Sequence, residues 1–198
     1  NGEVVDGDKM LYVLGKRLKS RGMLNHDTVV ATVMSNSGFF KSLEDVGIKC
    51  EQTNVGDRFV YECMQEKGYD LGGEQSGHII FGKYSTTGDG ILTSLMVMMT
   101  MLDKKMPLSM LADEMKMYPQ CLKNVIVKDK EEAQKNPAVL KGVEEVNKAL
   151  AGDGRMLLRA SGTEPKIRVM VEAKTDEICE KYVDQLIEVI KEQGLTAD

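Results

Sequence analysis

The chain has 198 residues, of which 42% are hydrophobic and 29% are charged, and its formal net charge is −5. This length suits one large domain or two small ones, and the composition is that of an ordinary protein with a substantial core. The acidic balance argues against nucleic acid as a partner, and no apolar run approaches the roughly 18 residues that span a bilayer. No signal-peptide pattern is present, so we expect a cytoplasmic protein without a membrane partner.

Four cysteines are far apart in the sequence, and no two of them form a CxxC pair. Because only His26 and His78 could join them as ligands, a zinc site is not expected. We interpret the cysteines as reduced thiols of a cytosolic protein. They are Cys50, Cys63, Cys121 and Cys179.

The first part of the chain alternates helical periodicity with β-branched runs. Asn1-Gly2 is typical of the tip of a hairpin, which suggests that a strand precedes it and that the sequence is a piece of a longer protein. Asp6 is expected to cap a helix that ends at Arg21-Gly22. Further helices are expected at 39–46, 58–67, 91–102 and 108–117, and strands at 28–34, 49–53, near Leu71 and at 78–81. This alternation predicts an α/β domain with a mixed sheet, residues 1–118.

Methionine is abundant in the helix expected at 91–102. Met96, Met98, Met99 and Met101 lie within two turns of one another. Because methionine fills irregular gaps in protein interiors, we expect this cluster to pack the helix into the core.

The pattern changes around Met117 to Gln120, where we place a domain boundary. Strands are then expected at 121–127, 155–160 and 167–173, and helices at 131–150 and 176–193. Pro137 marks either a break in the first of these helices or a helix start. The order strand, helix, strand, strand, helix predicts a small α+β domain, residues 119–198, with its helices on one face of an antiparallel sheet.

The connection between the last two expected strands, RASGTEPKIR from Arg159 to Arg168, is longer than a hairpin turn requires. Ser161 and Thr163 offer hydroxyls, and Gly162 lets backbone N–H groups turn inward to form a concavity for an anion. The two arginines can donate to phosphate oxygens. Composition alone fits a decorated hairpin with solvated charges equally well, and the spacing is not that of a Walker loop.

A second loop, GGEQSGH, ends at His78. Its glycines let the backbone approach a ligand closely. Glu74 can accept hydrogen bonds from adjacent sugar hydroxyls, Ser76 can donate or accept, and His78 can contact a sugar or a phosphate. Taken alone, the loop is explained more simply as a glycine-rich turn that enters a strand, with His78 packed.

Two further turns precede expected helices. TNVGDR brings Arg58 to a helix N-terminus, where an anion would be favoured, although a capped helix start explains the segment more simply. We interpret Thr86 to Gly90 as a helix cap with tight packing rather than as a ligand site.

Together these loops resemble the phosphohexomutase superfamily. GEQSGH resembles its sugar-recognition loop, RASGTEPKIRV resembles its C-terminal phosphate-binding loop, and TNVGDR and STTGDG flank the first loop in the expected order. GGEQSGHIIF and LLRASGTEPKIRVMVEA resemble the bacterial phosphoglucosamine mutase branch most closely, and the phosphomannomutase/phosphoglucomutase branch is the nearest competitor. The resemblance covers essentially the whole chain as the C-terminal half of such an enzyme.

The resemblance implies an isomerase that interconverts glucosamine 6-phosphate and glucosamine 1-phosphate for UDP-N-acetylglucosamine synthesis. In this family a phosphorylated serine, magnesium and a bisphosphorylated sugar take part. The third of four domains supplies the sugar-binding loop and the fourth holds phosphate. By position, Glu74 and Ser76 would hold ring hydroxyls, with His78 and Arg58 as auxiliary contacts. The implied phosphate-binding residues are Arg159, Ser161, Gly162, Thr163 and Arg168.

The sequence departs from the family pattern because the phosphoserine loop and the aspartate-rich metal loop belong upstream of it. Asp6-Gly7-Asp8 lacks the third aspartate and the arginine of that metal loop. Without a phosphoryl donor and magnesium, we expect no catalytic or metal residue in this chain and no activity from it alone. Its implied partners are a phosphosugar and the N-terminal half of the enzyme, and the resemblance allows a homodimer of the full-length protein. A mutase of other hexose phosphates and a non-catalytic phosphosugar-binding module are the alternatives.

Overall fold

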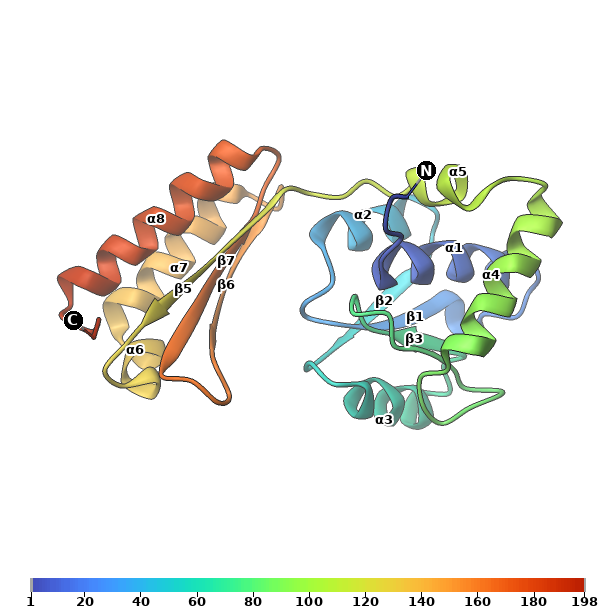
Figure 1. Ribbon diagram of the computed structural model, residues 1–198, viewed down its shortest axis with the longest axis horizontal. Helices are drawn as coiled ribbons and strands as arrows, with labels where there is room; N and C mark the ends of the chain where they lie inside the picture. The colour runs from blue at the N-terminus through green and yellow to red at the C-terminus, as the bar shows by residue number, and fades with distance from the viewer. Residues whose placement is uncertain (1, 198) are drawn as a thin grey trace. The chain divides into compact units, whose positions relative to one another are not determined.

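The computed structural model describes residues 2–197, so the hairpin tip that we expect at Asn1 lies outside the described residues. The chain divides into two compact units, Asn1–Met117 and Tyr118–Asp198 (Figure 1). No helix among residues 2–197 is both long enough and apolar enough to cross a membrane.

The first unit is built on a four-stranded mixed sheet with strand order β2-β1-β3-β4. Strands β1 (Thr28–Thr32), β2 (Lys49–Thr53) and β3 (Leu71–Gly73) are parallel, and β4 (Ile79–Phe81) is antiparallel to β3. All five residues of β1 are buried, as is usual for a central strand covered on both faces. The mixed α/β sheet predicted from the sequence is therefore confirmed.

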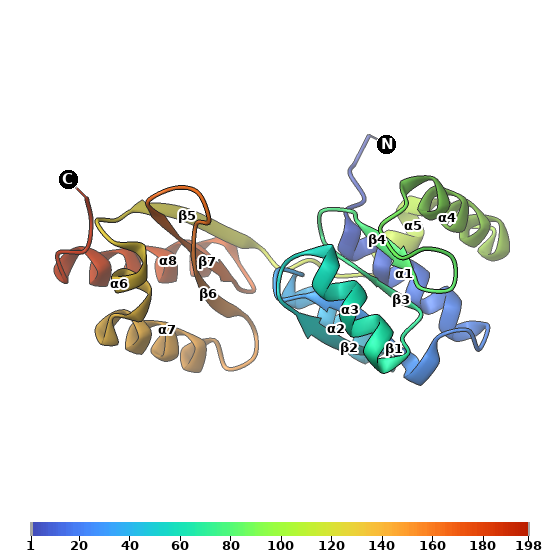
Figure 2. The same ribbon diagram turned by 90° about the horizontal axis from the view of Figure 1, so that it is seen from below.

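Helices cover both faces of this sheet. Helix α3 (Asp57–Lys67) packs Val60 and Met64 against Val30 and Ile80, and it lies in front of the sheet in Figure 2. The opposite face forms the larger core with the buried side of α1. The remaining helices of the unit are α1 (Gly7–Ser20), the short η1 (Asn25–Asp27), α2 (Ser37–Asp45), α4 (Gly90–Lys104) and α5 (Leu108–Asp113).

Helix α5 is shorter than the sequence predicts. It ends at Asp113, and the chain then turns to pack on α2. There the Lys116 N–H donates to Ser42 Oγ at 3.3 Å, and Gly38 lies against the Lys116 carbonyl. These contacts with α2 take the place of further helical turns.

The prediction that the methionine cluster packs α4 into the core is wrong for two of its members. Met96 is 7% exposed, whereas Met98 and Met99 are 49% and 48% exposed. Helix α4 is apolar on most sides, and only the side that carries Met96 and Val97 meets the core. The exposed apolar side chains recur at helical spacing and are called the α4 stripe below. They are Ile91, Leu95, Met98, Met99 and Leu102.

The second unit is a three-stranded antiparallel sheet with strand order β5-β7-β6 and helices on one face (Figure 1). Strands β5 (Gln120–Ile126), β6 (Arg155–Ala160) and β7 (Lys166–Glu172) match the predicted strands within a residue at each end. Alternate residues of β7 pack on the buried stripe of α8 (Asp176–Glu192). The predicted α+β architecture is therefore confirmed.

The helical segment between β5 and β6 consists of two helices. Helix α6 (Lys130–Lys135) ends at Asn136, and α7 (Pro137–Leu150) begins at the proline. The Asn136 side chain accepts from the N–H groups of Ala138 and Val139, while proline suits the first helical position because no N–H is needed there. Pro137 is thus a helix start, one of the two roles that the sequence left open.

Candidate functional site

The loop between β3 and β4 is a tight turn closed by its own backbone. The Glu74 N–H donates to the His78 carbonyl at 3.0 Å, and the Gly77 N–H donates to the Glu74 carbonyl at 2.9 Å. Gly77 has φ +100°, a conformation that favours glycine. These hydrogen bonds close the backbone of residues 74–78 into a turn, and the segment is called the Glu74 loop below.

Three of the predicted sugar-contacting side chains come together on the Glu74 loop. Ser76 Oγ lies 3.1 Å from His78 Nδ1, and the same nitrogen lies 3.9 Å from Glu74 Oε2. The other carboxylate oxygen, Glu74 Oε1, accepts the Gly56 N–H at 3.0 Å. The Glu74 side chain is 13% exposed and that of His78 is 61% exposed. Glu74 therefore anchors the neighbouring turn with one oxygen and keeps the other beside His78.

Arg58 follows the turn that Glu74 anchors, but its guanidinium is directed along α3. Its Nε donates to Glu62 Oε1 at 2.7 Å, one helical turn away, and this hydrogen bond raises the pKa of Arg58. The side chain is 81% exposed. The structure thus brings the backbone of the TNVGDR turn to Glu74, while the guanidinium pairs with Glu62.

Gly7 supports the Glu74 loop, and the sequence reasoning missed it. The Gly7 N–H donates to the Gln75 carbonyl at 3.0 Å, and a Cβ at this position would lie 2.0 Å from the Glu74 carbonyl oxygen. Asp6 caps α1 by accepting the Lys9 N–H at 3.0 Å, as predicted. A glycine in the first turn of a helix, where better helix formers are available, was the signal that could have indicated this close approach.

The connection between β6 and β7 contains the second group of predicted residues and is called the Ser161 loop, residues 161–165. The Ser161 N–H donates to the Lys166 carbonyl at 2.9 Å, and Ser161 Oγ accepts the Glu164 N–H at 3.3 Å. Ser161 is 4% exposed, while Gly162 and Thr163 are exposed. The serine side chain therefore closes the loop, and the next two residues form its outer surface.

Lys130, at the start of α6, holds this loop and was not predicted. Its Nζ donates to the Ser161 carbonyl at 2.9 Å and to the Gly162 carbonyl at 3.2 Å. No motif marks this lysine, because the contact joins segments 31 residues apart.

Two arginines flank the Ser161 loop on one face of the sheet. Arg159 and Arg168 are register partners on β6 and β7, and both are exposed. Glu164, the one carboxylate of the loop, pairs with Lys166 at 2.7 Å, and this hydrogen bond lowers the pKa of Glu164. Lys166 thus pairs with the carboxylate of the loop. The two arginines and the backbone N–H groups of the loop form a positively charged surface that suits an anion.

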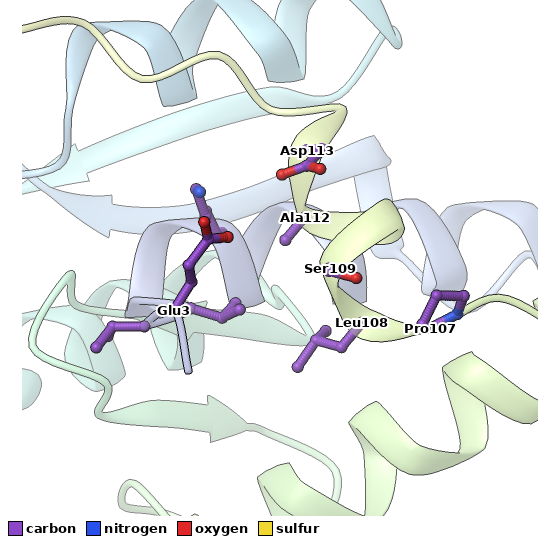
Figure 3. A pocket seen from close by; sticks show the side chains of 9 residues that line it. Glu3, Pro107, Leu108, Ser109, Ala112 and Asp113 are labelled. Carbon is purple, nitrogen blue, oxygen red and sulfur yellow. The ribbon is translucent and has the colours of Figure 1, made fainter. Parts of the chain in front are cut away.

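Neither loop lines the pocket shown in Figure 3. That pocket, of about 320 Å³, lies between the N-terminal segment and α5 and is bordered by Glu3, Lys9, Leu108 and Asp113 among others. Among residues 2–197, no three His, Cys, Asp or Glu side chains are grouped so as to hold a metal ion.

Comparison with known proteins gives consistent matches over both units. Residues 6–118 match the family model "Phosphoglucomutase/phosphomannomutase, alpha/beta/alpha domain III", and residues 122–189 match "Phosphoglucomutase/phosphomannomutase, C-terminal domain". The chain is 54% identical to the phosphoglucosamine mutase of Shouchella clausii over 97% of its own length and 43% of that relative. It is also 54% identical to the Bacillus subtilis phosphoglucosamine mutase, covering 98% of the chain and 44% of the relative. The chain thus spans less than half the length of these curated relatives.

Solved structures share the fold at low sequence identity. Aspergillus fumigatus N-acetylphosphoglucosamine mutase superimposes with a TM-score of 0.81 at 20% identity, over 97% of this chain and 44% of that one. A phosphoglucomutase/phosphomannomutase family protein from Burkholderia thailandensis gives a TM-score of 0.79 at 20% identity, over 100% of this chain and 44% of that one. At such identities the likeness establishes the fold alone.

Proposed function

This chain belongs to the phosphoglucomutase/phosphomannomutase family, and on that premise we propose that it is the substrate-binding portion of a phosphoglucosamine mutase. We assign residues 1–118 to the family's third domain, which carries the sugar-binding loop, and 119–198 to its fourth domain, which holds phosphate. Curated relatives that are 54% to 58% identical over nearly the whole chain support the choice of amino sugar.

The proposed reaction of the full-length protein is the interconversion of glucosamine 6-phosphate and glucosamine 1-phosphate. In this reaction, Glu74 accepts hydrogen bonds from ring hydroxyls of the sugar, and Ser76 donates to them or accepts from them. His78 contacts the sugar or its phosphate. Glu74 Oε2 is the carboxylate oxygen that suits this role, because Oε1 already accepts the Gly56 N–H. Arg58 uses its Nε on Glu62, and its two terminal NH2 groups remain as donors for an auxiliary contact.

The phosphate that is not transferred is proposed to bind at the Ser161 loop. Arg159 and Arg168 donate to its oxygens from adjacent strands, and the exposed backbone at Gly162 and Thr163 adds N–H donors. Ser161 contributes its hydroxyl proton, since its oxygen already accepts from Glu164. This arrangement is the observation that carries the proposal: two exposed arginines that are register partners on adjacent strands, beside a loop whose only carboxylate is paired with a lysine.

Phosphoryl transfer itself is assigned to parts of the relatives that this chain does not span. Among residues 2–197 no three His, Cys, Asp or Glu side chains are grouped to hold a metal ion, and the part that we assign to the described side chains is to bind and orient the phosphosugar. Aspergillus fumigatus N-acetylphosphoglucosamine mutase has been solved with GlcNAc-6P and magnesium and, as a serine-to-alanine variant, with glucose 1,6-bisphosphate, which supports magnesium and a bisphosphorylated sugar for the full-length enzyme. We expect the chain alone to bind substrate without turnover. The four free thiols support a cytoplasmic setting for the full-length protein.

An NMR titration of the chain with glucosamine 6-phosphate tests the proposal, with glucose 6-phosphate and inorganic phosphate as comparisons. We expect a Kd on the order of 1 mM, because the chain spans less than half the length of its curated relatives. Amide shifts at both the Glu74 and Ser161 loops, larger with the amino sugar, support it. Shifts confined to the Ser161 loop and equal for all three ligands would reduce the assignment to a phosphate-binding domain.

A further inference from the structure

The contact between Lys130 and the Ser161 loop defines a role for a residue outside the predicted set. Lys130 Nζ donates to two consecutive carbonyls, those of Ser161 at 2.9 Å and Gly162 at 3.2 Å. The role inferred from it rests on the proposed function, because it concerns how that loop presents donors to phosphate.

Because the peptide bond is planar and trans, the direction of these carbonyls determines the direction of the N–H groups that follow them. In a trans peptide the carbonyl of one residue and the N–H of the next point in opposite directions. The carbonyls of Ser161 and Gly162 face Lys130. The N–H groups of Gly162 and Thr163 must therefore point away from the lysine.

These two N–H groups are the ones that the loop leaves available. The Ser161 N–H is used by the Lys166 carbonyl, and the Glu164 N–H is used by Ser161 Oγ. Within the described range 2–197, the N–H groups of Gly162 and Thr163 make no hydrogen bond. Two successive unpaired N–H groups that point the same way form the type of concavity that binds an anion.

The lysine is itself held in place by the start of α6. Asp129 caps this helix by accepting the N–H groups of Glu131 and Glu132 at 2.8 and 3.0 Å, and Ala133 is buried in the core. The backbone of Lys130 is therefore fixed on the core, whereas Gly162 on the loop has the freedom of a glycine. The contact thus joins a helix that is anchored in the core to a loop that contains a glycine.

We propose that Lys130 is a positioning residue for phosphate, which turns the N–H groups of Gly162 and Thr163 toward the bound anion by holding the two preceding carbonyls. It acts through the loop backbone rather than by touching the ligand. Its substitution should weaken phosphate binding and disturb these two amides together.

Lys130→Met tests the role, because methionine keeps much of the side-chain length and loses the donors. Lys128→Met is the matched control, since Lys128 Nζ also donates to a backbone carbonyl in this unit, that of Gly194 at 3.0 Å. We expect Lys130→Met to weaken the binding of inorganic phosphate and glucosamine 6-phosphate by about tenfold, and Lys128→Met by less than about twofold. Lys130→Arg keeps the charge and the donors and should recover part of the affinity.

The wild-type chain provides a second readout that does not depend on a variant folding. During phosphate titration the amide protons of Gly162 and Thr163 should move more than those of Ser161 and Glu164, whose N–H groups are already used. Equal movement of all four would overturn the inference, as would an unchanged affinity in Lys130→Met. If the wild-type chain binds no phosphate at the Ser161 loop, the proposed function itself fails, and this outcome is distinct from a failure of the role of Lys130.

Discussion

Arg159 and Arg168 lie directly opposite each other on the adjacent antiparallel strands β6 and β7. Directly opposed residues of an antiparallel pair extend from the same face of a sheet, and like charges in such a pair are destabilising. Both side chains are exposed, and neither forms an ion pair within the described chain. We therefore expect a local electrostatic cost at this pair, which the interaction of Arg168 with Glu164 offsets in part and which a bound phosphate would relieve.

Substitution of Arg159 should therefore separate binding from stability. In Arg159→Ala we expect phosphosugar affinity to fall about tenfold, because a charge-assisted donor is lost. The free energy of unfolding should stay the same or rise by about 0.2–1 kcal/mol, because the opposed charge is removed. Calorimetric titration and urea unfolding measure the two quantities.

Lys141→Ala is the control for the loss of a positive charge in the same unit. Lys141 is an exposed lysine of α7 whose Nζ lies 3.7 Å from Glu145 Oε1. The Lys141→Ala variant should leave the affinity for the phosphosugar unchanged. If Arg159→Ala loses stability and affinity in parallel, the arginine supports the fold rather than the ligand.

Gly7→Ala should disturb the Glu74 loop, because it adds a side chain where the backbones of α1 and the loop are in contact. The added methyl group would lie 2.0 Å from the Glu74 carbonyl, so α1 or the loop must move. We expect a loss of about 1–3 kcal/mol in the free energy of unfolding, typical of overpacking, and weaker sugar binding. Amide spectra of residues 74–78 would locate the disturbance.

Gly90→Ala offers a close match, because Gly90 is also the first residue of a helix capped by an aspartate, Asp89. A Cβ there would meet nothing within 4 Å. This variant should be neutral or slightly stabilising, since alanine favours a helix. Similar losses in both variants would mean that helix starts in general, and not the contact with the loop, are sensitive.

Two substitutions of Glu74 should separate its structural role from its ligand role. Glu74→Gln keeps a carbonyl oxygen that can accept the Gly56 N–H, so stability should change little while sugar affinity falls. Glu74→Ala removes the acceptor and should cost about 1 kcal/mol in addition. Denaturant unfolding followed by sugar titration distinguishes them, and equal stability of the two variants would contradict the role of the Gly56 contact.

Cys50 should make the stability of the first unit depend on alkaline pH. Burial, reinforced by the charge of Asp8, raises the pKa of this thiol from 9.0 to about 12. Between these values the unfolded chain releases the thiol proton and the folded chain does not, so stability falls as pH rises. Below pH 9 the thiol is protonated in both states and the effect is absent. The slope from one such group is at most about 1.4 kcal/mol per pH unit.

Comparison of wild type with Cys50→Ala isolates this slope from the titration of lysines and tyrosines. Unfolding free energies measured from about pH 8 to about pH 11, a range that brackets the ordinary thiol pKa, should decline less steeply in the variant. Parallel declines would show that Cys50 ionises normally in the folded chain.

The sequence predicted the elements whose signals are local. β-branched runs located β1, alternating faces located β7, and Pro137 indicated a helix break or start. The side chains on the Glu74 loop and the Ser161 loop were identified because their motifs are contiguous. Their use as sugar and phosphate ligands remains a prediction.

What the sequence left undetermined depends on contacts between distant segments. Gly7 contacts Gln75, and Lys130 contacts Ser161. No periodic pattern in the sequence around any of these residues indicates the contact. Helix α4 is apolar on most sides, so periodicity could not show which methionines face the core. The hydroxyl of Ser161 was predicted as a ligand group, and its acceptance of the Glu164 N–H emerged only from the folded loop.

The α4 stripe also sets a practical condition for work on this polypeptide. Ile91 and Leu102 at its two ends are each 77% exposed, with half-exposed leucine and methionine between them. Contiguous apolar surface of this kind promotes self-association as protein concentration rises. Titrations that need millimolar ligand are therefore best run on dilute protein, with light scattering recorded beside each spectrum. Methionine sulfoxide at Met98 and Met99 would add polarity to the stripe, so the age and oxidation state of a preparation should change its colloidal behaviour.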